Sequence, residues 1–366
     1  MAKAQTAALT ARAAVAAAPA EVVSIDNLAD YARRLLDAAR DYAPSRLGKA
    51  QFRLPALDLE IRFTSKVFVD LCRRVLASSS AVTPLGKLKI FAMDADAPDW
   101  PMPQWWDEAS GFLSRGFDQT LAAVGLRGFY HHRHSWQVYD PATRTGVQSL
   151  PMPLGIPAWE TASPLRPFLH WAYASVGWRL THAATLGVNG RGALIVGASG
   201  SGKSGTAIAG LMNGLESVGD DFIVVSLDPE PTAYPVFRTF KQDREGLARA
   251  GIAPGERPLN WRGKVEFDPI ELARPLAERL EITALLIPRI THGTRTRILR
   301  ATAHQAALAL APSGVFQLPG DSVQGFRFFA ELTRRLPAFT VELSEDSREI
   351  AAAIGDFLDS GLLRAS

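Results

Sequence analysis

The amino-acid sequence predicts an α/β protein with two parts, an N-terminal α+β half and a C-terminal α/β half. Three observations carry this prediction. Residues 193–196 are an apolar run typical of a buried strand, residues 197–204 read G-x-x-x-x-G-K-S, and residues 205–212 have the pattern of a helix. Shorter, alternating strands are expected earlier in the chain. Residues 151–164, which are rich in proline, separate the two halves.

Composition indicates an ordinary globular chain. Of its 366 residues, 47% are hydrophobic and 21% are charged, and the net charge is +3. This charge gives no argument for a nucleic-acid partner, although the pI is about 9.1. Cys72 is the only cysteine, which excludes a disulfide framework and a cysteine-based metal site. No apolar run approaches the roughly 18 residues that a membrane span needs. We therefore expect no nucleic-acid or membrane partner and a cytoplasmic location.

Three segments are predicted along the chain. Residues 1–24 are rich in alanine and poor in leucine, and polar residues interrupt any core of the signal-peptide kind, so a disordered tail is expected. Residues 25–163 are predicted to form an N-terminal α+β domain that recognises a substrate or regulates the protein. Residues 164–366 are predicted to form a second domain, because longer helices and fully apolar strands begin there.

The elements of the N-terminal half follow from residue spacing. A helix is expected after Asp26 or Asn27, either of which can cap it, since apolar residues recur at Leu28, Tyr31, Leu35, Ala39 and Tyr42. Strict alternation predicts a half-exposed strand over residues 57–63. A helix over about residues 67–76 and a strand over residues 88–93 follow. Residues 96–106 are predicted to be an irregular loop plugged by aromatic rings, because they contain three prolines and the tryptophans Trp100, Trp105 and Trp106.

A hairpin is expected next, with residues 128–139 extended, a turn at Asp140 and Pro141, and residues 146–150 returning. Three histidines lie on the first strand. His132 and His134 would share one face, and His131 would lie on the other. Two interpretations stay open: a metal site, or ordinary surface or interface histidines, which the lack of a nearby carboxylate or cysteine favours.

The G-x-x-x-x-G-K-S motif predicts binding of a nucleoside triphosphate. Glycines let the backbone curl so that N–H groups point at phosphate oxygens, and the positive end of the following helix dipole faces the same oxygens. Lys203 is expected to reach the β- and γ-phosphates, and the Ser204 hydroxyl to coordinate Mg²⁺. The residues expected to bind ATP are Gly197, Ala198, Ser199, Gly200, Ser201, Gly202, Lys203, Ser204 and Gly205.

Two neighbouring carboxylates follow the loop helix. Asp220 and Asp221 come after Gly219 and precede the apolar run 222–225, so one helix and a turn return them to the phosphate loop. One acid can hold Mg²⁺ while the other accepts a proton from an attacking hydroxyl. Alternatively, the pair is an ordinary turn or helix cap.

The spacing of these residues resembles the catalytic domain of the HPr kinase/phosphorylase family. In that family a histidine precedes the loop and an Asp pair begins seventeen positions after the loop lysine; here His182 lies fifteen positions before Gly197, and Asp220 lies seventeen after Lys203. The resemblance implies a P-loop kinase domain with a mixed sheet like that of phosphoenolpyruvate carboxykinase. It also implies transfer of a phosphate from ATP, with Mg²⁺, to a serine of a peptide or small protein.

The same resemblance implies a role for each residue. Asp220 would be the general base, Asp221 and Ser204 would serve Mg²⁺, Lys203 would serve the phosphates, and His182 would line the catalytic site. A packed histidine that bonds to backbone is the alternative for His182. The family carries a Glu where Gly205 stands and an Ala in place of Gly219, and the N-terminal half does not resemble the regulatory domain of that family. Its layout is more similar to related kinases encoded beside peptide-modification genes, including lasso-peptide precursor kinases.

Several points remain open in the sequence. An arginine of the basic segment 290–297 would neutralise charge or grip an acidic substrate, unless this segment is a solvated loop; Arg238 and Lys241 are weaker candidates. The function expected is a serine kinase, with an ATP-binding regulator without transfer, or a small-molecule kinase, as alternatives. No L-S-G-G-Q signature points to a transport ATPase. A homo-oligomer is compatible with the sequence.

Overall fold

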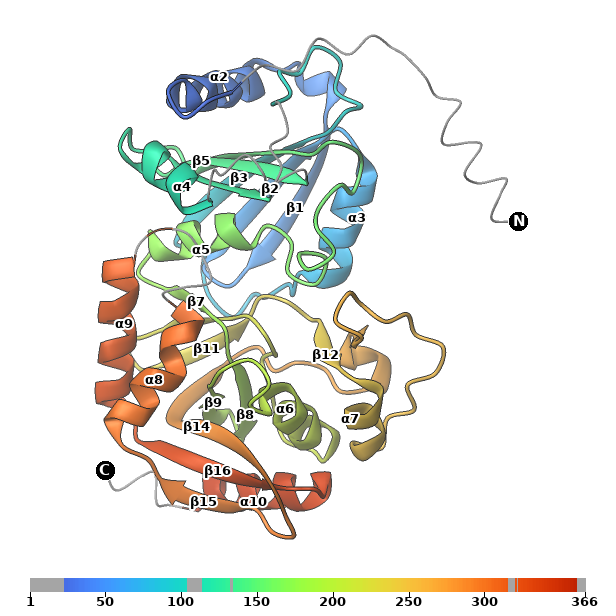
Figure 1. Cartoon of the computed structure of the whole chain (residues 1–366), viewed down its shortest axis with the longest axis vertical. Coiled ribbons are helices and arrows are strands. Elements are labelled where there is room, and N and C mark those ends of the chain that lie inside the picture. The colour runs from blue at the N-terminus through green and yellow to red at the C-terminus, as the bar shows by residue number, and fades with distance from the viewer. Residues whose placement is uncertain (1–22, 104–113, 132–133, 315–319, 321, 361–366) are drawn as a thin grey trace.

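The computed structural model describes residues 23–103, 114–131, 134–314, 320 and 322–360. It is an α/β structure with two mixed sheets and several helices, as the sequence predicted at this level (Figure 1). Most of the alanine-rich segment, together with Trp105, Trp106 and His132, lies outside the described residues. No helix among the described residues is long and apolar enough to cross a membrane.

The first sheet has six strands in the order β1-β2-β3-β6-β5-β4. β3 pairs in parallel with β2 and with β6, and the other neighbours are antiparallel. Helix α2 and helix α3 are well separated in the cartoon, and the sheet lies between them (Figure 1). The elements of this part are α2 (Leu28–Asp41), η1 (Pro44–Arg46), β1 (Gly48–Leu54), β2 (Leu57–Phe63), α3 (Lys66–Val75), β3 (Gly86–Met93), α4 (Ser114–Ala122), β4 (Arg127–His131), β5 (Ser135–Asp140) and β6 (Thr145–Ser149).

The spacing of apolar residues places the early elements correctly. In α2 the residues Leu28, Tyr31, Leu35 and Ala39 are all buried, although Asn27 makes no side-chain cap. β2 has the predicted bounds, with buried and half-buried residues in alternation. The predicted helix over residues 67–76 agrees with α3 to within one residue. Trp100 is buried, as expected for a loop plugged by aromatic rings.

The extended run predicted over residues 128–139 is wrong. The chain turns back between β4 and β5, which pair antiparallel with Tyr130 opposite Trp136, so His131 and His134 lie on either side of a turn. Six residues of extended chain would separate Tyr130 from Trp136 by about 20 Å. Their ring centroids are 6.4 Å apart, because both pack against Phe117 of α4. The hairpin between β5 and β6 is present as predicted.

The second sheet has the order β15-β16-β14-β11-β10-β7, with β9 beside β14 and β8 beside β9. β14 pairs in parallel with β9 and β16, and antiparallel with β11. Apolar clusters join α6 and α10 to one face, and α8 and α9 to the other (Figure 1). The elements are α5 (Arg166–Ala174), β7 (Arg179–Thr181), β8 (Ala184–Val188), β9 (Arg191–Ile195), α6 (Lys203–Met212), β10 (Ile223–Ser226), β11 (Thr232–Pro235), β14 (Leu280–Gly293), β15 (Arg297–Arg300), α8 (Ala303–Gly314), α9 (Ser322–Arg335), β16 (Ala338–Ser344) and α10 (Ser347–Asp359).

An excursion leaves this sheet between β11 and β14. It contains β12 (Phe240–Gln242), α7 (Arg244–Arg249), β13 (Val265–Phe267) and η3 (Pro269–Leu272), and β12 pairs with β13 as a separate two-stranded sheet. We call residues 240–272 the excursion below; residues 240–267 of it hold the two paired strands and α7.

The two large sheets share one apolar cluster. It joins Phe68 and Leu76 of the first part to Phe222 and Phe237 of the second. Leu76 and Phe237 also form an isolated β-bridge. The boundary predicted between residues 163 and 164 precedes α5, whose Trp171 stacks on Tyr139 of the first sheet. The two halves of the sequence therefore share a core and hold each other in place.

Candidate functional site

The glycine-rich loop connects β9 to α6 at the carboxyl ends of the parallel strands β9, β14 and β16. Ligands of open α/β sheets commonly bind at this edge. Gly202 is the residue before α6 and has a φ of 106°; a Cβ there would also meet Leu343 Cδ1 at 2.9 Å. Only glycine fits such a position without strain. The motif thus lets the loop run close to β16 while it turns into the helix.

Helix α6 begins at Lys203, and no side chain caps its N-terminus. The first backbone N–H groups of a helix lack partners within the helix and attract anions. The Lys203 side chain is 6% exposed, and its Nζ donates to the carbonyl oxygens of Gly197 at 2.8 Å and Ala198 at 3.1 Å. Burial lowers the pKa of Lys203, while the nearby Asp220 and Asp221 raise it. The lysine is thus held directly over the loop.

A cavity of about 960 Å³ opens in front of this loop. Most of its wall comes from four places in the chain: the loop with the start of α6, the Asp pair, the excursion, and the ends of β14 and β16 with the start of α10. Trp159 and Arg166, which flank the predicted domain boundary, also line it. Ligand pockets commonly have volumes of roughly 300–1,000 Å³. The cavity is therefore large enough for a nucleotide together with part of a second substrate.

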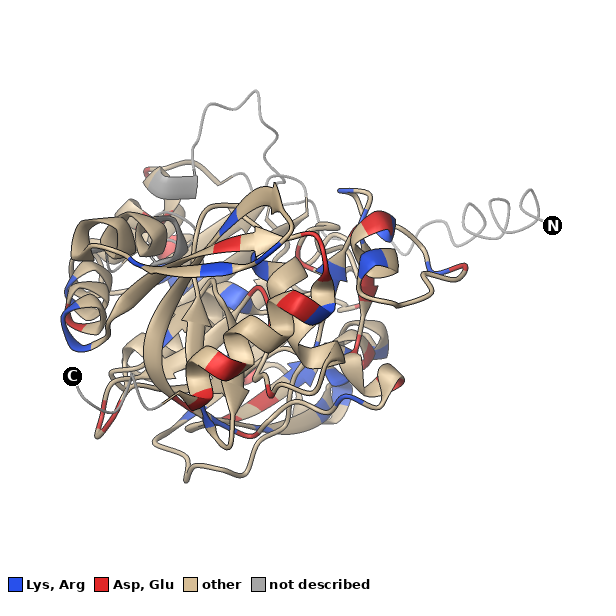
Figure 2. Ribbon diagram, turned by 90° about the horizontal axis from the view of Figure 1, so that it is seen from below, with Lys and Arg blue, Asp and Glu red and all other residues tan. Residues whose placement is uncertain are grey.

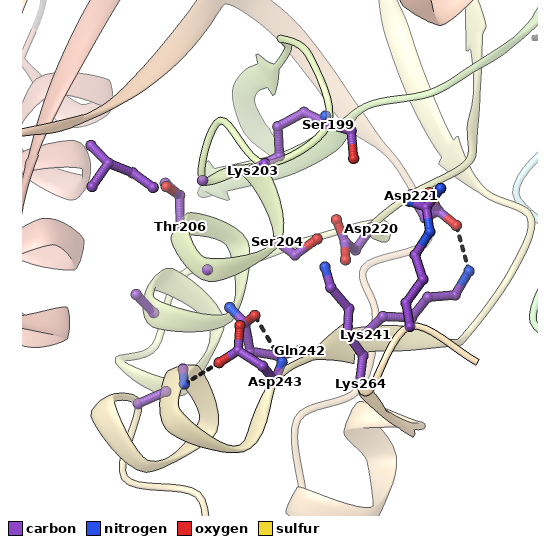
Figure 3. Close-up of a pocket in the computed structure, with 18 of the residues that line it drawn as sticks. Ser199, Lys203, Ser204, Thr206, Asp220, Asp221, Lys241, Gln242, Asp243 and Lys264 are labelled. Atoms are coloured by element: carbon purple, nitrogen blue, oxygen red, sulfur yellow. Dashed lines mark hydrogen bonds and ion pairs between the residues drawn. The ribbon is translucent and has the colours of Figure 1, made fainter. Parts of the chain in front are cut away.

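Asp220 lies on the cavity wall opposite the loop serine. Its residue is 1% exposed, and neither carboxylate oxygen makes a hydrogen bond of good geometry with a described residue. Ser204 and Asp220 point toward one another (Figure 3). Burial raises the pKa of Asp220, the Asp221 charge raises it further, and the Ser204 hydroxyl lowers it. A buried carboxylate of this kind is poised to accept a proton or a cation.

Asp221 has the opposite environment. Its Oδ1 lies 3.0 Å from His182 Nε2, and its Oδ2 accepts a hydrogen bond from Lys241 Nζ at 2.7 Å. Burial alone would raise the pKa of Asp221, but the Lys241 ammonium and the His182 hydrogen bond outweigh it and hold that pKa well below its usual range. Asp221 also has a φ of 68°, which is rare for a residue other than glycine. Strained backbone is often found at functional sites.

His182 therefore lies beside the Asp pair. Besides its contact with Asp221, its ring packs at 5.2 Å from that of Phe222, which in turn lies under the Arg166 guanidinium, 4.8 Å from the ring centroid. Arg166 also contacts Glu160. These contacts run without a break from Asp221 to the segment before α5. The His182 ring is thus packed against Phe222 and also lines the cavity.

Two cations of the excursion reach the cavity. Lys241, a weak candidate in the sequence, holds Asp221, and this partner raises the pKa of Lys241. No sequence pattern singled out Lys264, which directly precedes β13. Its side chain points into the cavity toward Ser204 and Asp220 (Figure 3). No local pattern distinguishes Lys264 from other surface lysines, because only the pairing of β12 with β13 brings it here.

Tryptophans from distant segments meet at the cavity wall. Trp159 and Trp261 are 39% and 53% exposed, and their ring centroids are 5.7 Å apart in an edge-to-face arrangement. The Arg262 guanidinium lies 4.5 Å from the Trp261 ring centroid. Large rings exposed beside a cavity are common at sites that bind a partner or ligand. Their meeting is not predictable from the sequence, since 102 positions separate Trp159 from Trp261.

The remaining candidates differ in whether they reach the cavity. Ile290 and His292 line the cavity, whereas Arg295 and Arg297 do not. Arg238 Nη2 donates to backbone carbonyls of α3, so it joins the two halves of the protein. No group of three or more His, Cys, Asp or Glu residues that could hold a metal occurs within the described residues. Of the predicted histidine cluster, His131 is buried and lies 3.4 Å from Glu160.

Charges of both signs are interspersed over the elements seen in Figure 2. The charge arrangement that distinguishes the cavity is thus local, with the anions Asp220 and Asp221 facing cations from the loop and the excursion.

In comparisons with known proteins, no family model matches the chain, and no curated protein matches it.

Proposed function

We propose that the protein is an ATP-dependent kinase that transfers the γ-phosphate to a serine hydroxyl of a peptide or small protein. The observation that carries this proposal is the pair Asp220 and Asp221 beside the phosphate loop, with their pKa values displaced in opposite directions. Neighbouring carboxylates with such different environments are typical of sites that divide acid–base work between them. The proposal places the enzyme in the cytoplasm, where ATP is abundant.

The proposed reaction is a direct displacement. The loop N–H groups and Lys203 hold the phosphates, and the serine Oγ of the acceptor attacks the γ-phosphorus. The new bond from Oγ to phosphorus forms as the bond to the β–γ bridging oxygen breaks. Asp220 accepts the hydroxyl proton, for which its raised pKa and free oxygens suit it. ADP and the phosphoserine product then leave.

A magnesium ion fits the residues present. Mg²⁺ prefers oxygen ligands and is commonly bound through one or two carboxylates together with substrate phosphates and water. The Ser204 hydroxyl and the Asp221 carboxylate are the residues proposed to hold it, because the lowered pKa keeps Asp221 negatively charged. When bound, the ion neutralises negative charge on the phosphates. Lys241 would then share Asp221 with the ion, and His182 would keep that carboxylate in place.

The acceptor is proposed to bind along the contacts that lead from His182 to the N-terminal half. Phe222, Trp159 and Trp261 offer apolar surface there, and Arg166 and Arg262 offer charge. The N-terminal half would thus recognise the acceptor through residues at its boundary. We further propose that the second sheet is a P-loop kinase fold akin to that of phosphoenolpyruvate carboxykinase, as in the HPr kinase/phosphorylase family. Its parallel strands β9, β14 and β16 beside the loop support this proposal.

The proposal is tested with the full-length protein, γ-labelled ATP, Mg²⁺ and a mixed library of serine-containing peptides. Label is expected in peptides of the serine library and not in a matched library in which alanine replaces serine. ATP binding without label transfer or ADP formation would instead favour a regulator that only binds the nucleotide. Label transferred to a small-molecule alcohol, and not to peptides, would favour a small-molecule kinase.

A further inference from the structure

Lys264 is the one cavity lysine of the described residues that the proposed function leaves without a task. Lys203 lies over the phosphate loop, and Lys241 holds Asp221. Lys264 enters from the opposite side, and Figure 3 shows its side chain directed at the space between Ser204 and Asp220. Its Nζ makes no ion pair with a described residue. A half-buried ammonium that makes no ion pair is disfavoured, unless a ligand supplies the charge.

The backbone around Lys264 is held in a tight turn. Asn260 Oδ1 accepts hydrogen bonds from the backbone N–H groups of Arg262 at 2.9 Å and Lys264 at 3.0 Å. The Asn260 N–H donates to the Lys264 carbonyl at 2.7 Å, and Asn260 Nδ2 donates to Glu266 at 2.8 Å. Gly263 occupies the left-handed region, with a φ of 69°. The side chain of Lys264 is thus presented from a fixed base, as a ligand-binding group should be.

The charge around this space also calls for an anion. Lys264 and Lys203 repel each other, and this repulsion adds to the burial that lowers the pKa of Lys203 against the opposing charges of Asp220 and Asp221. Figure 3 shows Lys264 pointing toward the Asp220 carboxylate, whose oxygens make no hydrogen bond of good geometry with a described residue. A phosphoryl group between the two lysines would supply up to two negative charges and oxygens that accept from both ammonium groups.

We propose that Lys264 binds the γ-phosphate of ATP from the side opposite Lys203 and so distinguishes ATP from ADP. This inference rests on the proposed function, because it assumes that the loop holds the nucleotide. The β-phosphate, which ADP retains, lies against the loop and Lys203, so Lys264 contacts only the group that is transferred. Trp261 and Arg262 belong to the same Asn260 turn. Binding of the γ-phosphate therefore also fixes the part of the excursion that faces the acceptor.

The test compares two nucleotides on the full-length protein with Mg²⁺: ADP and adenylyl imidodiphosphate, an ATP analogue that is not hydrolysed. Calorimetric dissociation constants are measured for wild type, Lys264→Met, Lys264→Arg and Lys203→Ala. The control is Lys87→Met, which removes an exposed lysine of the first sheet. Lys264→Met is expected to reduce the affinity for the analogue about tenfold or more, the scale of a charged hydrogen bond. The affinity for ADP should stay within about twofold of that of the wild type. Lys264→Arg should keep part of the preference for the analogue.

Lys203→Ala is expected to weaken both nucleotides, and Lys87→Met neither. Equal loss of ADP and analogue affinity in Lys264→Met, or no loss of either, would overturn the inference and leave the proposed function intact. Failure of the wild type to bind either nucleotide would overturn the proposed function, and the inference with it. Thermal unfolding of each variant shows whether a loss of affinity reflects a loss of fold.

Discussion

The two walls of the cavity are built in different ways. The loop wall, residues 197–204, offers backbone N–H groups, one buried lysine and a serine hydroxyl in a continuous stretch of chain. The excursion wall, residues 240–267, offers long cationic side chains, each positioned by a separate contact: Lys241 by Asp221, and Lys264 by the Asn260 turn. In the proposed function, the loop wall would bind phosphate through its local conformation, whereas the excursion wall depends on tertiary packing.

This difference assigns separate properties of the site to the two walls. A backbone cradle binds any nucleotide with a suitable diphosphate. Side chains on the facing wall are placed to act on the terminal phosphate and the carboxylates. We therefore expect substitutions in the loop wall to reduce binding and transfer together, and substitutions across the cavity to affect individual steps.

The largest effect is expected from Lys203→Ala in the loop wall. It removes the ammonium that lies over the loop carbonyls, and phosphate transfer should fall on the order of 1,000-fold, comparable to loss of a preorganised charge donor at other transition states. Lys203→Arg should restore little, because a planar guanidinium does not fit a cradle built around a point charge. Radiolabel transfer and nucleotide binding measure both effects. Normal binding and transfer by Lys203→Ala would contradict the assignment of the loop.

Asp221→Asn tests the pairing across the cavity. Losing this carboxylate should raise the Mg²⁺ concentration needed and reduce transfer roughly 10- to 100-fold. Its charge also raises the pKa of Asp220, so the pKa of the general base should fall in the variant. A base acts when it is deprotonated, so activity is lost as pH falls through its pKa. The acid limb of the pH–rate profile should therefore move to lower pH. A limb that does not move would contradict the effect of the Asp221 charge on the pKa of Asp220.

A smaller effect is expected on stability. Because the pKa of Asp220 is raised by folding, its ionised form destabilises the native state, and this cost grows as pH rises through that pKa. Asp220→Asn should thus increase the free energy of unfolding by about 1–2 kcal/mol at neutral pH, with less gain near pH 4. Asp118 is the contrasting control. Burial raises the pKa of its carboxyl too, but Arg127 and the Gly128 N–H bond this carboxylate, so removing its charge leaves the Arg127 guanidinium without its partner. Asp118→Asn should destabilise, and a loss of stability in both variants would contradict this account of Asp220.

Local patterns sufficed for much of the fold and for one wall of the site. Apolar spacing gave α2, β2 and α3. The glycine motif and the spacing of the Asp pair predicted that both carboxylates would return to the loop, and Asp220 and Asp221 line one cavity with it. The turn between β4 and β5 was not predicted, because the sequence has neither glycine nor proline between these strands. Burial of aromatic rings against α4 favours the turn instead.

The facing wall was harder to predict for the same reason. Lys264 and Trp261 reach the cavity through the pairing of β12 with β13, and Trp159 through the packing of the segment before α5. Each of these contacts joins residues far apart in the sequence. Lys241 could be singled out as a candidate, but its partner Asp221 could not be predicted from spacing.

The most direct test of the central claim is the transfer of γ-labelled phosphate by wild type and Asp220→Asn at equal nucleotide occupancy. Asp220→Asn keeps the size of the side chain and removes the base, so ATP binding should be retained while transfer to the serine library falls about 100-fold or more. The Asp118 carboxylate lies outside the cavity, so Asp118→Asn should transfer phosphate at the wild-type rate under conditions in which the variant is folded. Equal transfer by wild type and Asp220→Asn would contradict the assignment of Asp220 as the general base of a phosphoryl transfer.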